Sequence, residues 1–202
     1  MRRLAVLWLC LAAVVAAGEE STPQRLLQST ADRLLTVVNA QRDQLRAEPA
    51  RLQSLVREHL VPRVDFARLS ALALGRAWRS ASAEQRARFT VEFERMLVRT
   101  YATGLLEFET WEIRYPPQRI ASDADDVLVR TEVLRPGAPP VPVDYRMHLE
   151  GGVWRVYDVV IEGVSFASTY RTSFEQEIRQ TGLDGLIDRL GELNAARVGP
   201  AG

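Results

Sequence analysis

The most regular pattern of apolar and polar residues lies between Val143 and Ser165, on both sides of the dipeptide Gly151-Gly152. Such alternation is typical of strands, and two glycines suit a tight hairpin because glycine accepts positive φ. A two-residue loop would fix how the strands pair. The facing pairs that it predicts are Glu150 with Val153, Leu149 with Trp154, Met147 with Val156, Tyr145 with Asp158, and Val143 with Val160. One face of this hairpin is then apolar apart from Asp158, and it needs a cover from elsewhere in the chain.

Before the hairpin, apolar residues recur with the period of a helix. The helices predicted from this pattern span residues 23–47, 50–60, 64–74 and 82–104. Pro49 and Pro62 end the first two of these helices, and Gly75 is a suitable end for the third. Ser82 and Gln85 have the spacing of a capping box at the start of the fourth.

Two shorter segments predict strands at 111–115 and 127–134, and a proline-rich turn at 135–140 leads into the hairpin. After the hairpin, the helical period returns at 166–180 and 183–196, with Ser165 suited to be the N-cap residue. Helices come first, then an antiparallel meander, then helices again. This order predicts an α+β fold, in which helices pack on one face of a twisted sheet that is antiparallel or mixed.

The first 20 residues have the features of an export signal. Arg2 and Arg3 precede an apolar run at 4–15, which is shorter than the ~20 residues that a membrane-spanning helix needs. Small residues up to Ala17 form a cleavage site, so we expect a signal peptide at 1–17 and a single domain at 18–202. Cleavage would remove Cys10, and the remaining chain could then hold no disulfide and no thiol chemistry.

Composition excludes several kinds of chemistry. The formal net charge is +0 and all 26 basic residues are arginine, which excludes lysine-dependent phosphate loops, Schiff bases and general bases. The arginines are scattered and form no stripe with aromatic residues, which argues against binding to nucleic acid. His59 and His148 lack the spacing of metal ligands, so we expect both at the surface and no metal site.

Asp158 allows two interpretations because it stands among apolar residues. It could act as a general base in a pocket. It could instead accept hydrogen bonds from Tyr145 or from the backbone of the turn that follows. We favour this structural interpretation, because buried polar groups usually have partners and the sequence offers no catalytic partner for the carboxylate.

Several segments, in their order and spacing, resemble the MlaC (toluene-tolerance) family of periplasmic phospholipid-binding proteins. They are Val64-Asp65-Phe66, Ala73-Leu74-Gly75, Ser82-Ala83-Glu84-Gln85-Arg86, the run from Trp154 to Ser165, and Gly182-Leu183-Asp184-Gly185-Leu186. The resemblance covers nearly the whole chain after the export signal. The departures are the lack of lysine and a proline-rich loop at 136–142.

The resemblance implies a cystatin- or NTF2-like fold that encloses an acyl-chain pocket. It also implies a monomeric, non-enzymatic carrier in the periplasm. This carrier would shuttle glycerophospholipid between an outer-membrane lipoprotein complex and an inner-membrane ABC transporter complex, and so maintain outer-membrane lipid asymmetry. Phospholipid would be its cargo, and it would need no cofactor.

Two other functions stay open at this point. The first is an isomerase- or dehydratase-like enzyme in a cone-shaped α+β pocket, which would use Asp158 and a tyrosine. The second is a periplasmic adaptor that docks another protein through an apolar surface.

The expected acyl-chain site combines the apolar hairpin face with residues of the preceding helices. The candidate lipid-binding residues are Phe66, Leu69, Leu72, Tyr101, Val129, Val133, Val143, Met147, Val160 and Val164. Most of them would be core residues in any globular protein. If they line a lipid instead, Val160→Glu should leave the protein folded but without phospholipid, because a carboxylate cannot stay among acyl chains.

Overall fold

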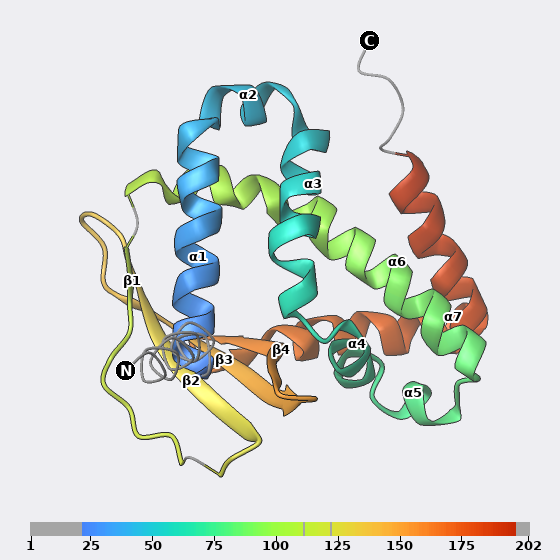
Figure 1. The fold of residues 1–202 in the computed structure, drawn as a ribbon. Helices are drawn as coiled ribbons and strands as arrows, with labels where there is room; N and C mark the ends of the chain where they lie inside the picture. The colour runs from blue at the N-terminus through green and yellow to red at the C-terminus, as the bar shows by residue number, and fades with distance from the viewer. Residues whose placement is uncertain (1–21, 111, 122, 197–202) are drawn as a thin grey trace, which may run out of the picture.

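The computed structural model describes residues 22–110, 112–121 and 123–196, so the expected signal peptide lies outside the described residues. The helices before the sheet are α1 (Pro23–Ala40), α2 (Arg42–Ala47), α3 (Pro49–His59), η1 (Val61–Arg63), α4 (Phe66–Leu74), α5 (Arg76–Ser80), α6 (Ala83–Tyr101) and η2 (Ala102–Thr110). The strands and the last helix are β1 (Glu112–Arg114), β2 (Asp126–Leu134), β3 (Val141–Glu150), β4 (Val153–Ile161), β5 (Val164–Ser165) and α7 (Phe166–Ala196). Figure 1 shows the sheet at one side of the molecule and the helices α4 to α7 grouped at the other.

The first predicted helix is two helices in the structure, because the chain leaves helical geometry at Gln41 (φ −123°, ψ 19°). The Thr22 side chain caps α1, and Pro23 starts it at a position where a missing N–H is tolerated. The break at Gln41 turns α2 away from α1, and Leu45 becomes fully buried in a cluster with residues of α1 and α3. The prediction of one continuous helix over 23–47 is therefore wrong, because tertiary burial overrides the local pattern.

The other predicted helices agree with α3, α4, α6 and α7. Gly75 follows α4 with a φ of 55°, a value that favours glycine. Ser82 and Gln85 form the expected capping box, in which the Gln85 N–H donates to Ser82 Oγ at 3.1 Å and the Ser82 N–H donates to Gln85 Oε1 at 3.0 Å. At the start of α7, the Ser168 N–H donates to Ser165 Oγ at 3.2 Å, as expected for an N-cap.

The strands form one open sheet in the order β1-β2-β3-β4-β5, and every neighbouring pair is antiparallel. The hairpin turns at Gly151 (φ 58°) and Gly152 (φ 81°), so both glycines have the positive φ that such a turn requires. The pairing predicted next to the turn is confirmed as far as Met147 with Val156. The predicted α+β class is confirmed as well.

Beyond Met147, the predicted register is wrong by one residue. A β-bulge lies there: Arg146 pairs with Asp158, which leaves Tyr157 without a partner strand residue. The pairs that follow are Tyr145 with Val159, Asp144 with Val160, and Val143 with Ile161. Neighbouring residues of a strand point to opposite faces, so the extra residue moves Asp158 and Val160 to the face opposite the predicted one.

The helix α1 covers one face of the sheet. The other face meets solvent along β2 but is covered near β4, where His148 and Asp158 are buried against the starts of α4 and α7. Along β2, the side chains of Val129 and Val133 are buried, whereas those of Leu128 and Arg130 are exposed. The buried face packs against α1 through Leu26. This packing of helices against an antiparallel sheet agrees with the predicted arrangement. No helix within the described residues is long and apolar enough to cross a membrane.

A second apolar core lies away from the sheet, between α4, α6 and α7. Phe93 stacks on Phe89 with ring centroids 5.4 Å apart, and Phe174 meets Phe93 edge-on at 5.5 Å. The helix α7 kinks at Gly182 (φ 77°), between the two helical segments that the sequence predicts, and Leu186 beyond the kink joins the same cluster. We call the cluster around Phe89, Phe93 and Phe174 the aromatic core. It fixes the positions of the helices that border the cavities described next.

Candidate functional site

Two adjoining cavities lie between the helices and the sheet. The first, which we call the α4 cavity, has a volume of about 320 Å³. Its lining residues are Val56, Leu60, Val61, Val64, Phe66, Leu69, Leu97, Val98, Tyr101, Ala102, Leu105, Val156, Tyr157, Asp158, Val159, Ile161 and Phe166. Apart from two tyrosines and one aspartate, these side chains are pure hydrocarbon, so the wall offers little to a polar ligand.

The second, which we call the β3 cavity, has a volume of about 600 Å³. Its lining residues are Ala31, Leu34, Leu35, Leu60, Leu105, Ile113, Val133, Arg135, Val141, Val143, Tyr145, Val159, Ile161 and Glu162. Its two charged residues, Arg135 and Glu162, are both exposed and so mark its rim. The remainder of the wall is again apolar apart from the tyrosine hydroxyl.

Four residues line both cavities, namely Leu60, Leu105, Val159 and Ile161. Val159 also lines a third hollow of about 180 Å³, together with Tyr145. The hollows are thus separated by single side chains and form one largely apolar layer between the helices and the sheet. The α4 cavity also reaches Tyr157 and Asp158 of β4, so it is not confined to one face. Both large cavities fall in the range of about 300–1,000 Å³ that is usual for ligand pockets.

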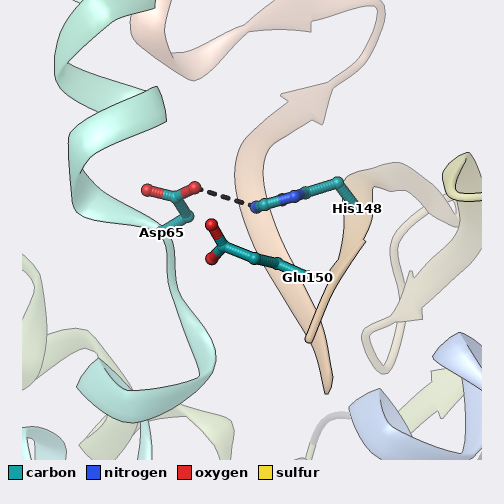
Figure 2. Close-up of side chains that lie close together, drawn as sticks. All are labelled: Asp65, His148 and Glu150. Carbon is teal, nitrogen blue, oxygen red and sulfur yellow. Dashed lines mark hydrogen bonds and ion pairs between the residues drawn. The ribbon is translucent and has the colours of Figure 1, made fainter. Parts of the chain in front are cut away.

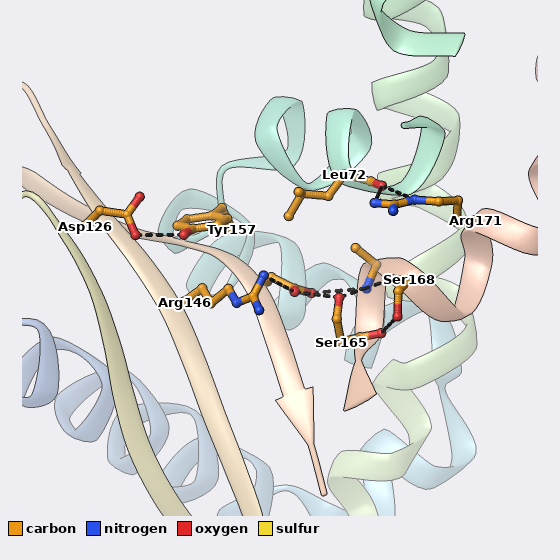
Figure 3. Close-up of polar contacts among 9 residues, drawn as sticks. Leu72, Asp126, Arg146, Tyr157, Ser165, Ser168 and Arg171 are labelled. Carbon is orange, nitrogen blue, oxygen red and sulfur yellow. Dashed lines mark hydrogen bonds and ion pairs between the residues drawn. The ribbon is translucent and has the colours of Figure 1, made fainter. Parts of the chain in front are cut away.

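Asp158 is the one acid that lines the α4 cavity, and its carboxylate is fully used in hydrogen bonds that stabilise the local structure. Its side chain is fully buried, and its carboxylate accepts hydrogen bonds from Ser165 Oγ at 2.7 Å and from the Ala167 N–H at 3.1 Å (Figure 3). The Arg146 guanidinium lies 3.7 Å away. The carboxylate ties β4 to the first turn of α7, so the structural interpretation of Asp158 is confirmed. Tyr145 is not its partner, because the bulge places the two side chains on opposite faces of the sheet.

The tyrosines around the cavities favour the neutral form. Burial raises the pKa of Tyr145. Burial, together with a hydrogen bond to Tyr101, raises the pKa of Tyr170, and the two hydroxyl oxygens of that pair lie 2.8 Å apart. The hydroxyl of Tyr145 therefore adds no charge to the wall of the β3 cavity.

A separate group of polar side chains joins α4 to the sheet (Figure 2). His148 Nε2 lies 2.8 Å from Asp65 Oδ2, and the other carboxylate oxygen of Asp65 caps α4 by accepting the Arg68 N–H at 2.9 Å. Glu150 brings a third potential metal-ligating group, with ligand atoms all within 4.8 Å, but it already pairs with Arg155 at 3.0 Å. We interpret this group as a latch between helix and sheet.

The latch corrects one expectation from the sequence. His148 is only 8% exposed, so its placement at the surface is wrong. Its partner Asp65 stands 83 residues away, and no local spacing could have revealed the pair.

The structure brings together five of the ten candidate lipid-binding residues at the cavities. Phe66, Leu69 and Tyr101 line the α4 cavity, and Val133 and Val143 line the β3 cavity.

The other five candidates line neither cavity. Val129 and Met147 are completely buried in a packed cluster beneath α1. Leu72 borders a polar cleft, where its carbonyl accepts a hydrogen bond from Arg171 Nε at 3.1 Å (Figure 3). Val160 lies on the opposite face because of the bulge, and Val164 is 55% exposed beside the cavities.

Sequence reasoning missed the residues that both cavities share. The register predicted from a two-residue loop places Val159 on the face away from the cavities, and the run Val159-Val160-Ile161 is apolar throughout and so does not indicate a face. Leu60 and Leu105 lie where regular helix gives way to other conformations, at the end of α3 and within η2. A period computed along a regular helix does not extend to such positions.

The fold and its apolar layer of cavities are those of an α+β protein with a pocket for an apolar ligand. The family model described as MlaC protein matches residues 28–192. The chain therefore belongs to the MlaC family, as its sequence motifs indicate.

Three similar proteins support this membership. The chain is 27% identical over 174 residues to the intermembrane phospholipid transport system binding protein MlaC of Haemophilus influenzae, covering 85% of this chain and 81% of that protein. It is 29% identical over 170 residues to the toluene tolerance protein ttg2D of Pseudomonas putida, covering 83% and 79%. A phospholipid-binding protein from Ralstonia solanacearum, solved in complex with a phospholipid, is 34% identical with a TM-score of 0.77, covering 87% of this chain and 98% of that one.

Proposed function

We propose that this protein is a periplasmic phospholipid carrier that holds the acyl chains of its cargo in the α4 and β3 cavities. The main support for the proposal is that two hydrocarbon-lined cavities adjoin each other and share the wall residues Val159 and Ile161. The phospholipid-bound relative from Ralstonia solanacearum supports the same class of ligand.

Energetics explain why a carrier needs such cavities. Moving an acyl chain from a bilayer into water costs about 0.8 kcal/mol per methylene. For two chains of ~16 carbons the gross cost is on the order of 25 kcal/mol. A carrier must therefore bury nearly all of both chains, and an apolar cavity makes the exchange with a bilayer close to neutral.

We further propose that the carrier acts between two membranes. The Haemophilus influenzae relative is named as the binding protein of an intermembrane phospholipid transport system, which supports this role. Exchange that is close to neutral gives no direction by itself, so direction would come from partners, an outer-membrane lipoprotein complex and an inner-membrane ABC transporter complex. The consequence would be maintenance of outer-membrane lipid asymmetry by a monomeric carrier without cofactor.

An enzymatic role has less support. The rival enzyme would use Asp158, but this carboxylate is bonded to Ser165 and to the Ala167 N–H and is fully buried. An adaptor without lipid is likewise disfavoured, because an adaptor needs an apolar surface and gains nothing from apolar cavities.

Export follows from the N-terminal signal and is part of the proposal. We expect cleavage close after Ala17. N-terminal sequencing of the exported protein would test it, and a protein that still begins at Met1 would contradict export by this route.

The direct test of the carrier function is mass spectrometry of an organic extract of the purified protein. We expect glycerophospholipid in amounts comparable to the protein. A folded protein that yields no phospholipid, and that takes none up from vesicles, would contradict the proposal.

A further inference from the structure

Three large apolar side chains are exposed beside the cavities. Val164 is 55% exposed, Tyr101 is 50% exposed and Ile161 is 41% exposed. Ile161 pairs with Val164 across the β4–β5 turn, and the Tyr101 ring packs edge-on against Phe166, two residues after Val164, at 5.2 Å. These three side chains therefore stand close together, and we call them the rim residues.

The rim residues lie where the cavities approach the protein surface. Tyr101 and Ile161 line the α4 cavity and Ile161 also lines the β3 cavity, while both side chains are about half exposed. A side chain that is at once in a cavity wall and in contact with solvent marks a place where the cavity opens. Ile161 is thus located where both cavities approach the same part of the surface.

The turn between the strands holds one side of this opening in place. Glu162 has a φ of 50° and Gly163 has a φ of 83°, the pair of positive values that a tight two-residue hairpin needs. For glutamate this conformation is strained, and such strain is typical of functional segments. The Glu162 N–H also donates to the Pro142 carbonyl at 3.0 Å, which ties the turn to β3.

The other side of the opening is held less firmly. Tyr101 is the last residue of α6, and its ring is half exposed. Its described contacts there are the ring of Phe166 and the hydroxyl of Tyr170, at 2.8 Å between the oxygens. One exposed aromatic ring can turn aside at the cost of one hydrogen bond and one ring contact.

We infer that acyl chains enter and leave the cavities through a portal between Tyr101 and the β4–β5 turn, with Ile161 and Val164 as the apolar surface over which they pass. The inference rests on the proposed carrier function and adds the route that the cargo takes. An acyl chain in transit is penalised for every methylene in water. An apolar rim that continues the cavity wall shortens the exposed stretch, and this explains why valine and isoleucine stand at an exposed turn.

The test compares two valines that are exposed to a similar degree. Val164→Asp places a charge on the portal, whereas Val153→Asp places one on another turn, where Val153 is 42% exposed and borders neither cavity. Each protein is purified, its phospholipid is quantified, and its exchange of a fluorescent phosphatidylcholine with phosphatidylcholine vesicles is followed in time. Zwitterionic vesicles keep overall charge attraction out of the comparison.

We expect Val164→Asp to keep its purified phospholipid and to exchange it about tenfold or more slowly, because a carboxylate in the path disfavours a passing hydrocarbon chain. Val153→Asp should exchange at the unmodified rate. Exchange of Val164→Asp at that same rate would overturn the portal and leave the carrier function intact. Absence of phospholipid from the unmodified protein would instead contradict the carrier function.

Tyr101→Ala provides a second test with the opposite sign. Removing the ring uncovers the opening, so exchange should become several times faster while the protein stays folded. An unchanged or slower rate would overturn the assignment of Tyr101 to the portal, whether or not Val164→Asp folds.

Discussion

The aromatic core and the cavity layer are built from the same kinds of residue and differ in how they are packed. In the aromatic core, Phe93 touches Phe89, Tyr170 and Phe174 with ring centroids 5.3 to 5.5 Å apart, and Phe93 is completely buried. In the cavity layer, residues such as Val159 face open space on the side where a neighbour would be. An apolar residue therefore predicts burial from water. Whether it lies in a packed core or in a cavity wall depends on the residues around it.

The α4 helix shows how the cavity layer is kept open. Its C-terminal half packs into the aromatic core through Ala73 and Leu74. Its N-terminal end is tied to β4 by the Asp65 N–H, which donates to the Val156 carbonyl at 2.8 Å, and to β3 by His148. Helix and sheet are thus joined at defined points, and the space beside those points need not collapse.

The largest expected effect concerns the aromatic core. Phe93→Ala should lower the free energy of unfolding by about 3–5 kcal/mol, because it removes a fully packed ring. Phe66→Ala, at the wall of the α4 cavity, should lower it clearly less, because Phe66 already borders open space. Denaturant unfolding of both variants, freed of lipid, measures the difference. Equal losses of stability would contradict the claim that the aromatic core is more tightly packed than the cavity layer.

The second prediction concerns the link between the regions. Asp158→Asn should destabilise the protein by about 1–3 kcal/mol. The amide keeps one uncharged acceptor oxygen and turns an NH2 group towards one of the two donors, Ser165 Oγ or the Ala167 N–H. Phospholipid content should not change, since the carboxylate serves the turn and not the cargo. Thermal unfolding with lipid quantitation checks both points. Loss of turnover on a small substrate, with lipid binding intact, would favour the enzyme instead.

The smallest expected effect is a loss of stability at alkaline pH. The pKa of Tyr145 and that of Tyr170 are raised in the folded protein by burial. The unfolded chain therefore releases these protons from about pH 10 upward while the folded chain keeps them, so stability falls as the pH rises above that value. Tyr170→Phe should reduce the slope of unfolding free energy against pH in this range. An unchanged slope would show that Tyr170 does not contribute.

Local signals in the sequence predict much of the fold because they depend on neighbouring residues. The capping box at Ser82, the stop at Gly75 and the turn at Gly151-Gly152 each arise within a few residues, and all three are confirmed. The same holds for the alternation of β2, which places Val129 and Val133 on the buried face. The α+β class follows from the order of these elements.

The candidate site is less predictable because it depends on contacts between distant residues. The unpaired Tyr157 shifts the register by one, which replaces Val160 with Val159 and Ile161 on the cavity side. Burial patterns alone also cannot separate Met147, which is packed, from Val143, which borders a cavity. Such differences arise only when helices and sheet are assembled.

The most direct test of the central claim, that the cavity layer holds acyl chains, uses the neighbours Val159 and Val160. Val159 lines both cavities, whereas Val160 pairs with Asp144 on the other face of the sheet. Phospholipid is quantified by mass spectrometry in Val159→Glu and Val160→Glu, after each variant is shown to be folded by its thermal transition. The account predicts a folded Val159→Glu without phospholipid, because its carboxylate would lie among acyl chains, and a Val160→Glu with the full amount. Phospholipid retained in Val159→Glu, or lost only in Val160→Glu, would contradict it.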